Sequence, residues 1–249
     1  MKTEWDYTQL AEAYLKRPDY APEALEKIYD LVGLKKGDKV CDIGAGVAHL
    51  TLPLARYGCL VDSVEPNDAM RALGKQRTAN MQGVAWFEGT GEATGLPGGA
   101  YDFVSFGSSF NVCDRKAALA ETYRLLKPGK SFACLWNHRD LDDPIQKGIE
   151  DIIKKQIPDY GYGTRREDQS AVIKESGLFV DVQYIEGRIM WAQSVPDTIE
   201  AWRSHGTLQR QAGARFDEIV GHIADYLSKY GAQIQIPYTT RAWVAKRKD

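Results

Sequence analysis

The sequence predicts an α/β fold in which a doubly wound, mostly parallel sheet of seven strands is covered by helices on both faces. Strand-like and helix-like segments alternate from about residue 38 to 136, which is typical of parallel strands joined by crossover helices. A Gly-rich turn follows the first apolar strand. The chain of 249 residues is long enough for one such domain with a modest insertion, so we expect a single domain over 1–249.

The central part of the chain contains five short apolar segments separated by helical ones. The predicted strands lie at 39–42, 60–64, 84–87, 101–106 and 131–136, and the helices between them at 49–57, 68–77 and 114–126. Pro66 ends the second strand, Asn67 can cap the helix that follows, and the turn 127–129 ends the last helix. The order is that of a Rossmann-like core over 38–140.

Helices are also expected before and after this core. Two helices at 7–16 and 22–32 precede the sheet, the second opened by Pro22 and closed by Gly33. The remaining elements are helices at 145–156 and 168–175, strands at 180–190 and 233–246, and helices at 197–204 and 216–230 between those two strands. We therefore expect an N-terminal helical lid over 1–33 and a helical cap insertion over 194–232, before the last strand.

Composition and charge exclude several classes of protein. Hydrophobic residues make up 43% of the chain and charged residues 27%, which are ordinary globular values. Lys and Arg total 32 against 34 Asp and Glu, so no global positive field would attract nucleic acid, and the basic tail 246–248 is interpreted as a solvated strand end. Composition thus argues against nucleic acid as a partner and leaves the oligomeric state open.

Neither a membrane segment nor a metal centre is predicted. No stretch approaches the roughly 20 apolar residues that cross a bilayer, and the start of the chain, with Glu4 and Trp5, lacks a signal-peptide pattern. We expect a cytoplasmic protein without a membrane partner. The cysteines at 41, 59, 113 and 134 show no C-x-x-C spacing, and no His, Cys, Asp or Glu cluster has metal-ligand spacing.

The segment 40–65 predicts a binding site for an adenosine-containing cofactor. Gly44 and Gly46 allow a sharp turn and a close approach of a ligand to the backbone, at the N-terminus of a helix whose N–H groups favour a carboxylate. Asp42 can order the turn or accept from an ammonium group. Glu65 ends the next strand 21 positions after Gly44, where its carboxylate can accept both hydroxyls of a ribose.

Four motifs together resemble the class I S-adenosylmethionine-dependent methyltransferases, in correct order over about 7–140. They are Asp42-Ile-Gly-Ala-Gly-Val-Ala, Glu65-Pro, Gly89-Thr-Gly-Glu-Ala with Leu96-Pro, and Arg124-Leu-Leu-Lys-Pro-Gly129. The phrase 135–140 resembles a small-molecule branch of the family. The resemblance implies S-adenosylmethionine as the cofactor. Two positions depart from the family pattern: Ala48 replaces the third glycine, and Thr90 replaces a frequent Asp.

The resemblance also implies which residues hold the cofactor. Asp42, Gly44, Ala45 and Gly46 would hold the methionyl part, and Glu65 the ribose. Met70, Thr90, Gly91 and Glu92 would flank the adenine, and Gly107 and Ser108 would approach the sulfonium.

The acceptor side is expected after the fourth strand. A related branch of the family has His-Trp where this chain has Asn111-Val112, and loss of that His favours an amine acceptor with a free lone pair. A base elsewhere is the alternative, and His138 at the carboxyl edge of the sheet is the candidate. Tyr7 and Tyr14, two helical turns apart, could close over the cofactor and contact the acceptor; ordinary packing is the other interpretation.

Aromatic and basic residues further along the chain are candidates for an acceptor pocket. Phe110, Trp191, Trp202 and the run 160–162 could form its wall, because cationic centres favour aromatic faces. The arginines at 139, 165, 166 and 203 leave an anionic acceptor open, with Arg139 as the predicted binding residue. For each of these side chains, a core or solvated position is the competing interpretation.

Three functions remain open on the sequence. The first is methyl transfer to a small molecule, with N-methylation slightly ahead of O-methylation. The second is a nicotinamide-dependent dehydrogenase, although the third glycine of its fingerprint is His49. The third is a cofactor-binding protein without catalytic activity, which the departures at Thr90 and at 111–112 keep open.

Overall fold

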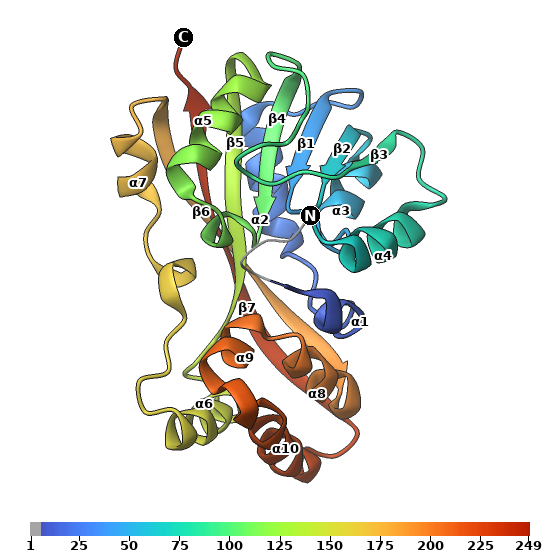
Figure 1. The fold of residues 1–249 in the computed structure, drawn as a ribbon, viewed down its shortest axis with the longest axis vertical. Helices are drawn as coiled ribbons and strands as arrows, with labels where there is room; N and C mark the ends of the chain where they lie inside the picture. Colours follow the sequence, from blue (N-terminus) through green and yellow to red (C-terminus); the bar gives the residue numbers. More distant parts are fainter. Residues whose placement is uncertain (1–5) are drawn as a thin grey trace.

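The computed structural model describes residues 6–249, and Glu4 and Trp5 lie outside them. Its centre is one seven-stranded sheet of order β3-β2-β1-β4-β5-β7-β6 (Figure 1). The strands are β1 (Lys39–Ile43), β2 (Leu60–Val64), β3 (Val84–Phe87), β4 (Tyr101–Gly107), β5 (Leu126–Arg139), β6 (Phe179–Ser194) and β7 (Gln233–Arg247).

The direction of the strands confirms the predicted mostly parallel sheet. β1 is parallel to β2 and β4, and the next neighbours outward, β3 and β5, are parallel as well. β7 is antiparallel to both β5 and β6. The order reverses between β1 and β4, and open α/β sheets bind ligands at the carboxyl ends of strands at such a reversal.

Helices were predicted with correct order and small errors at their ends. They are α1 (Ala11–Tyr14), α2 (Pro22–Val32), α3 (Thr51–Tyr57), α4 (Asp68–Thr78), α5 (Arg115–Leu125), α6 (Pro144–Gln156), α7 (Ser170–Glu175), α8 (Val195–Arg203), α9 (Gly206–Ala212) and α10 (Phe216–Leu227). The first predicted helix is instead a 3-10 turn, η1 (Thr8–Leu10), followed by the single turn of α1. α9 and the 3-10 turns η2 (Phe110–Val112) and η3 (Gly163–Arg166) were not predicted.

Each face of the sheet packs a separate apolar core. On one face Leu25 and Ile28 of α2 and Leu54 of α3 pack with inward residues of β1, β2, β4 and β5. On the other face Leu119 of α5 and Ile173 of α7 pack with the alternate residues of β4 and β5. The alternation of buried side chains along each strand therefore produces three layers, helix, sheet and helix.

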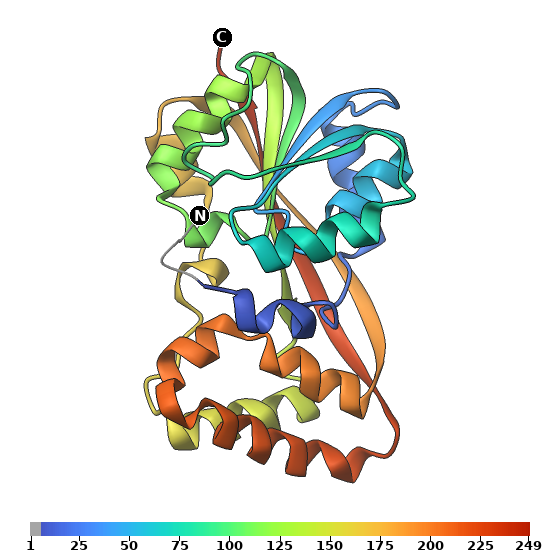
Figure 2. The same ribbon diagram turned by 45° about the vertical axis from the view of Figure 1, so that its right-hand side comes forward.

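A third core lies outside these layers, in a helical cap formed by α6, α8, α9 and α10. Ile153 of α6, Trp202 of α8 and Ile223 of α10 pack in it against the first residues of β7. β5, β6 and β7 extend beyond the main sheet to this cap, and α1 lies between the cap and the α/β core (Figures 1 and 2).

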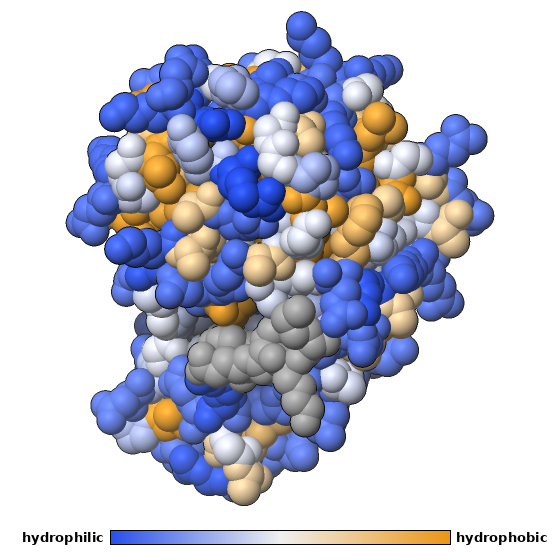
Figure 3. All heavy atoms as spheres, turned by 45° about the horizontal axis from the view of Figure 1, so that its top comes forward, coloured by the Kyte–Doolittle hydropathy of each residue, from blue (hydrophilic) through white to orange (hydrophobic). Residues whose placement is uncertain are grey.

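The surface on the face drawn in Figure 3 is dominated by hydrophilic side chains, and the hydrophobic ones lie in separate groups. Among residues 6–249, no helix combines the length and the apolar character needed to cross a membrane.

Candidate functional site

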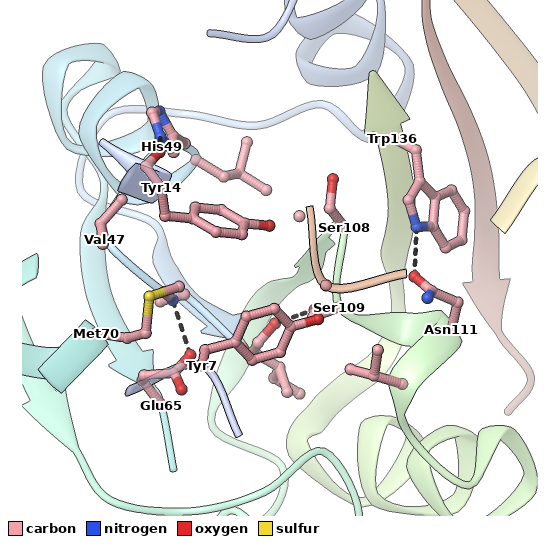
Figure 4. A pocket seen from close by; sticks show the side chains of 18 of the residues that line it. Tyr7, Tyr14, Val47, His49, Glu65, Met70, Ser108, Ser109, Asn111 and Trp136 are labelled. Carbon is pink, nitrogen blue, oxygen red and sulfur yellow. Dashed lines mark hydrogen bonds between the residues drawn. The ribbon is translucent and has the colours of Figure 1, made fainter. Parts of the chain in front are cut away.

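A cavity of about 450 Å³ opens at the carboxyl ends of β1, β2 and β4, where the strand order reverses. Its wall combines the segments that follow these strands with the N-terminal segment and the first residues of α9. Figure 4 shows part of this wall, with Glu65 and Met70 on one side and Asn111 and Trp136 on the other. The cavity therefore lies where the sequence predicted the cofactor site.

The turn after β1 depends on glycine because the chain after β4 lies directly against it. A Cβ at Gly44 would come within 2.4 Å of Ser109 Cβ, and Gly44 has a φ of +66°. The Ser109 hydroxyl donates to the carbonyl of Ile43 at 2.5 Å. Both facts fix the turn against the end of β4, which shapes the floor of the cavity.

Ala48 takes the place of the family's third glycine and adopts a φ of +75°. It is fully buried. Left-handed backbone is unfavourable for a residue with a Cβ, which explains why glycine is preferred at this position.

Asp42 orders the turn, because its carboxylate is bonded within the protein. The side chain is fully buried, and its two oxygens accept from the hydroxyls of Thr51 at 2.7 Å and Ser105 at 3.0 Å. Burial raises the pKa of this carboxyl to about 7, against the opposing effect of the two hydroxyl donors. Of the two roles predicted for Asp42, the geometry supports the ordering of the loop.

The backbone N–H groups of the turn are already bonded within the protein. Gly44 and Ala45 donate to the carbonyl of Val64 at 2.8 and 3.0 Å, and Gly46 donates to Glu65 Oε2 at 2.9 Å. These three N–H groups are therefore not available to a carboxylate of a ligand. The turn contributes close approach of the backbone, as the lack of side chains at Gly44 and Gly46 allows.

Glu65 presents a buried, oriented carboxylate to the cavity. Its Oε2 accepts from Gly46 N and its Oε1 from Asn67 N, both at 2.9 Å, and the side chain is 7% exposed. Burial raises the pKa of Glu65, and the two backbone donors oppose that rise. Each carboxylate oxygen keeps further acceptor capacity, so Glu65 can still accept two hydroxyl donors.

The loop after β3 closes the same end of the cavity. Thr90, Gly91 and Glu92 all line it, together with Met70 of α4. Glu92 Oε1 accepts from Asp114 N at 2.7 Å, which ties this loop to the start of α5. A Cβ at Gly91 would lie 2.5 Å from Cys113 Sγ, so the two loops are in close contact.

Gly107 ends β4 and Ser108 directly follows it, and both residues line the cavity. Ser108 has a φ of +62°, an uncommon conformation for a residue with a side chain, and its hydroxyl shares a hydrogen bond of 3.0 Å with the Tyr20 hydroxyl. A Cβ at Gly107 would lie 2.9 Å from that Tyr20 oxygen. Tyr20 therefore fixes the end of β4 at the cavity wall.

Three of the residues predicted to act on the acceptor side line the cavity: Tyr7, Tyr14 and Asn111. The two tyrosine rings lie edge to face with centroids 6.0 Å apart and both point into the cavity (Figure 4). Asn111 Oδ1 accepts from Trp136 Nε1 at 2.7 Å, so its amide is held in one orientation. Burial raises the pKa of Tyr7, which keeps this hydroxyl protonated.

His49 connects the N-terminal segment to the glycine turn. One ring nitrogen lies 3.0 Å from the carbonyl of Tyr14 and the other 3.2 Å from Asp19 Oδ1. Since both nitrogens have partners, His49 positions α1 over the cavity and offers no free nitrogen to a ligand.

Four predicted side chains do not line the cavity. Phe110 is fully buried because η2 directs it into the core beside Phe106, with centroids 5.3 Å apart. Trp202 packs in the cap under Arg139, and Trp191 packs against the cap core from β6. The prediction that these three aromatics form the cavity wall is wrong, whereas Arg139 does line it.

His138, the predicted base, is the fourth. It lies on β5 and is 2% exposed, and neither ring nitrogen has a hydrogen-bond partner among residues 6–249. Burial, reinforced by Arg165, Arg166 and Arg241, lowers its pKa to about 3. The ring is therefore neutral, and the geometry gives no support to its role as a base on the acceptor.

Several residues of the wall were not singled out from the sequence. They include Arg17, Tyr20, Ser109, Asn137, Gly206, Thr207 and Tyr238. Arg17 directly precedes a proline, and Gly206 contacts Tyr7 from α9. No local pattern distinguishes such positions, because they meet only through the fold. Within 6–249, no three His, Cys, Asp or Glu side chains are grouped so that they could hold a metal ion.

The fold and this site define a protein that binds an adenosine-containing cofactor in the manner of a methyltransferase. Comparisons with known proteins agree, since residues 41–134 match the family described as "Methyltransferase domain". An uncharacterized methyltransferase of Mycobacterium bovis is 34% identical over 124 residues, which are 50% of this chain and 48% of that protein. A ubiquinone/menaquinone biosynthesis C-methyltransferase of Psychromonas ingrahamii is 29% identical over 139 residues, 53% of this chain and 55% of that protein.

Solved structures share the fold. The YcgJ protein of Bacillus subtilis aligns with a TM-score of 0.58 and 16% identity, covering 91% of this chain and 98% of that one. A phosphoethanolamine N-methyltransferase 2 of Haemonchus contortus, in complex with S-adenosyl-L-methionine, aligns with a TM-score of 0.53 and 16% identity, covering 91% of this chain and 52% of that one.

Residues 41–134 thus match a methyltransferase domain, and the relatives and the fold together support a class I S-adenosylmethionine-dependent methyltransferase with S-adenosylmethionine as its cofactor. This confirms the predicted family and cofactor. The chain spans about half the length of the curated relatives that it matches.

Proposed function

We propose that this chain transfers a methyl group from S-adenosylmethionine to a small-molecule acceptor, and that the acceptor atom is nitrogen rather than oxygen. The observation that carries the first part is the buried Glu65 carboxylate, which two backbone N–H groups orient at the mouth of the Gly44–Gly46 turn. The expected cytoplasmic location and the expected lack of nucleic-acid and membrane partners stay predictions from composition.

The residues of the cavity fit the cofactor part by part. Glu65 would accept the ribose hydroxyls, because its oxygens keep acceptor capacity, and Met70 with the loop 90–92 would flank the adenine. The turn 44–46 would pass close to the methionyl part, and Ser108 would lie near the sulfur. When bound, S-adenosylmethionine supplies a methyl group activated by a sulfonium.

The protein's own contribution is alignment and the exclusion of water. Methyl transfer requires the acceptor lone pair in line with the methyl–sulfur bond, so fixed positioning supplies much of the rate. Two hydrogen-bonded pairs, Tyr20 with Ser108 and Trp136 with Asn111, hold the wall rigid at this point. The predicted lid over 1–33 and cap over 194–232 would close the cavity, with Tyr7 against Gly206 as one contact between them.

The preference for nitrogen is supported by the side chains of the wall. A neutral amine reaches the methyl group with its lone pair free, whereas a hydroxyl acceptor must lose a proton to a base. His49 has both ring nitrogens bonded and His138 lies away from the wall, so neither imidazole is available as that base. The structure shared with a phosphoethanolamine N-methyltransferase agrees with a small acceptor.

The test is a transfer assay with isotope-labelled S-adenosylmethionine and a panel of small amines, phenols and activated methylene compounds. Product analysis by NMR assigns the label to nitrogen, oxygen or carbon; carbon is included because a matched relative carries the name of a C-methyltransferase. We expect label on nitrogen. Transfer to phenols alone would contradict the preferred acceptor atom, and tight cofactor binding without any turnover would favour a non-catalytic protein.

A further inference from the structure

Three arginines line the cap side of the cavity, from three different parts of the chain. Arg17 follows α1, Arg139 ends β5 and Arg165 lies in η3. We call these three side chains the guanidinium cluster. Within residues 6–249, none of them forms an ion pair with a carboxylate, whereas other basic side chains such as Lys16, Lys27 and Lys127 do so.

The guanidinium of Arg139 lies over aromatic rings, and its Nε has no hydrogen-bond partner among residues 6–249. Its guanidinium carbon lies 4.0 Å from the centroid of the Trp202 ring and 5.7 Å from that of Tyr238. Its Nε is buried without a hydrogen-bond partner in the described part of the chain. Stacking fixes the plane of the group, and a guanidinium held in this way presents its N–H groups in the geometry that matches a carboxylate or phosphate.

Arg165 is in a similar state. Its Nε is buried and has no partner among residues 6–249, and its guanidinium carbon lies 5.7 Å from the centroid of the Tyr162 ring. Burial and the nearby charges of Arg17 and Arg139 lower its pKa to about 10, so it still carries its charge at neutral pH. Buried like charges that repel each other are unfavourable unless an anion pairs with them.

Arg17 differs from the other two because the protein already orients it. Its Nε and one terminal nitrogen donate to the hydroxyl and the carbonyl of Ser204, both at 2.8 Å, and it lies 4.6 Å from the Tyr14 ring centroid. It connects the N-terminal segment to the cap and adds its charge to the cluster.

The acidic side chains of the cavity lie at the other end. The carboxylates of the wall are Asp42, Glu65, Glu92 and Asp114. All of them lie in or after the strands β1 to β4, on the side of the cavity that we call the cofactor half. Among residues 6–249, these carboxylates accept hydrogen bonds from hydroxyl and backbone donors of that half. No carboxylate of the wall thus neutralises the guanidinium cluster.

We propose that the acceptor carries an anionic group, a carboxylate or a phosphate, which Arg139 and Arg165 bind while Arg17 adds its charge. The inference rests on the proposed methyl transfer and specifies its acceptor class. The anion would anchor one end of the molecule on the cap side and leave the methylated atom facing Ser108 and Asn111. A competing source of the same chemistry is the carboxylate of the cofactor itself, which the experiment separates.

The experiment measures binding of inorganic phosphate and of malonate to protein saturated with S-adenosylhomocysteine, by calorimetry and thermal shift at constant ionic strength in NaCl. We expect at least one of the two anions to bind with a dissociation constant in the millimolar range or below. Arg139→Gln and Arg165→Gln should each weaken that binding at least tenfold, and the Lys variants should restore part of it. The anion that binds more tightly indicates the class of the acceptor's anionic group: malonate indicates a carboxylate, and inorganic phosphate indicates a phosphate.

Arg203→Gln is the matched control, because Arg203 is an exposed arginine of the cap that pairs with Glu200 at 3.5 Å. It should leave anion binding within twofold. Circular dichroism checks that each variant is folded. The proposal is overturned if neither anion binds beyond the effect of NaCl, or if binding survives in both Gln variants.

The cofactor is tested in the same proteins. If both Gln variants weaken S-adenosylhomocysteine binding more than tenfold, the cluster holds the carboxylate of the cofactor and the proposed acceptor class is wrong. If the wild-type protein does not bind S-adenosylhomocysteine at all, the proposed function itself fails, and that result is distinct from both others.

Discussion

The cofactor half of the cavity and the cap half, which Arg17, Arg139 and Arg165 line, differ in how far their polar groups are hydrogen-bonded within the protein. In the cofactor half, Asp42 and Glu65 each have both carboxylate oxygens bonded within the protein. In the cap half, Arg139 and Arg165 keep buried nitrogens without a partner among the described residues. The cofactor half is thus complete before any ligand binds, whereas the cap half gains its missing partners only with an anion.

This difference suggests how the two ligands are recognised. A rigid, fully bonded half loses little freedom when it binds, which favours tight binding of a constant ligand such as the cofactor. The cap half combines segments from the N-terminus, β5, η3 and α9, so its charges and shape can change without disturbing the glycine turn. The predictions below test the comparison, starting with the largest expected effect.

The first prediction concerns Glu65→Ala. Removing a charged acceptor of two hydroxyl groups should weaken S-adenosylhomocysteine binding by at least about 100-fold, since hydrogen bonds to charged groups contribute about 1.5 to 3 kcal/mol each. Calorimetry measures the change. Glu88→Ala is the control, because Glu88 directly precedes the cavity loop at 90–92 and its side chain is half-exposed. This change should alter binding less than threefold. Equal affinities of wild type and a folded Glu65→Ala protein would refute the assigned role.

The second prediction compares two glycines with similar backbone angles. Gly44 and Gly95 have φ values of +66° and +73°, but a Cβ at Gly44 would meet Ser109 at 2.4 Å, whereas one at Gly95 has no atom within 4 Å. Gly95→Ala should lower the free energy of unfolding by about 1 kcal/mol, through the backbone alone. Gly44→Ala should lower it by about 3 kcal/mol and abolish cofactor binding.

Chemical denaturation measures both glycine variants. Similar losses of stability would show that the contact with Ser109 is relieved by a small shift, and that the cofactor half is less rigid than described.

The third prediction is a pH dependence that belongs to the cofactor half. Burial raises the pKa of Asp42 to about 7 in the folded protein, against about 3.9 in an unfolded chain. The folded state therefore holds a proton that the unfolded state releases, and this group's stabilising contribution is present below pH 4 and is lost as pH rises to about 7. Relative to Asp42→Asn, the free energy of unfolding of the wild type should fall by ~3 kcal/mol from pH 4.5 to pH 7.5.

Denaturant titrations of both proteins at the two pH values give this difference directly. A constant difference between wild type and Asp42→Asn would mean that the carboxylate stays ionised throughout.

The fourth prediction has the opposite sign and belongs to the cap half. Burial lowers the pKa of His138 to about 3, against about 6.5 in an unfolded chain. The unfolded state binds the extra proton, so stability is lost as pH falls from 6.5 towards 3. Relative to His138→Gln, the wild type should lose about 2 kcal/mol of unfolding free energy between pH 7 and pH 5. Because the ring lies away from the wall, kcat of His138→Gln at pH 7.5 should stay within threefold; a loss above 100-fold would restore it as a base.

The sequence predicted the cofactor half of the cavity better than the cap half. The glycine turn, Glu65 and the loop at Thr90 depend on local spacing between a strand end and the next helix, so both their presence and their meeting at the sheet edge could be predicted. The alternation of strands and helices predicted the seven-stranded sheet for the same reason.

Errors arose where a side chain's direction depends on distant packing. Phe110 lies in the expected segment, but η2 turns it into the core beside Phe106, and no pattern in the sequence shows that turn. Arg17 and Arg165 are separated along the chain and meet only because the cap packs against the N-terminal segment. The acceptor half is therefore a product of the fold, while the cofactor half follows from local sequence.

The most direct test of the central claim is a calorimetric titration of the wild-type protein with S-adenosylhomocysteine and, separately, with NAD. We expect S-adenosylhomocysteine to bind with a dissociation constant at least 100-fold below that of NAD, because the ribose site at Glu65 is joined to a cavity shaped by the methyltransferase turn and not by a dinucleotide fingerprint. Tight binding of NAD with no measurable binding of S-adenosylhomocysteine would contradict the account.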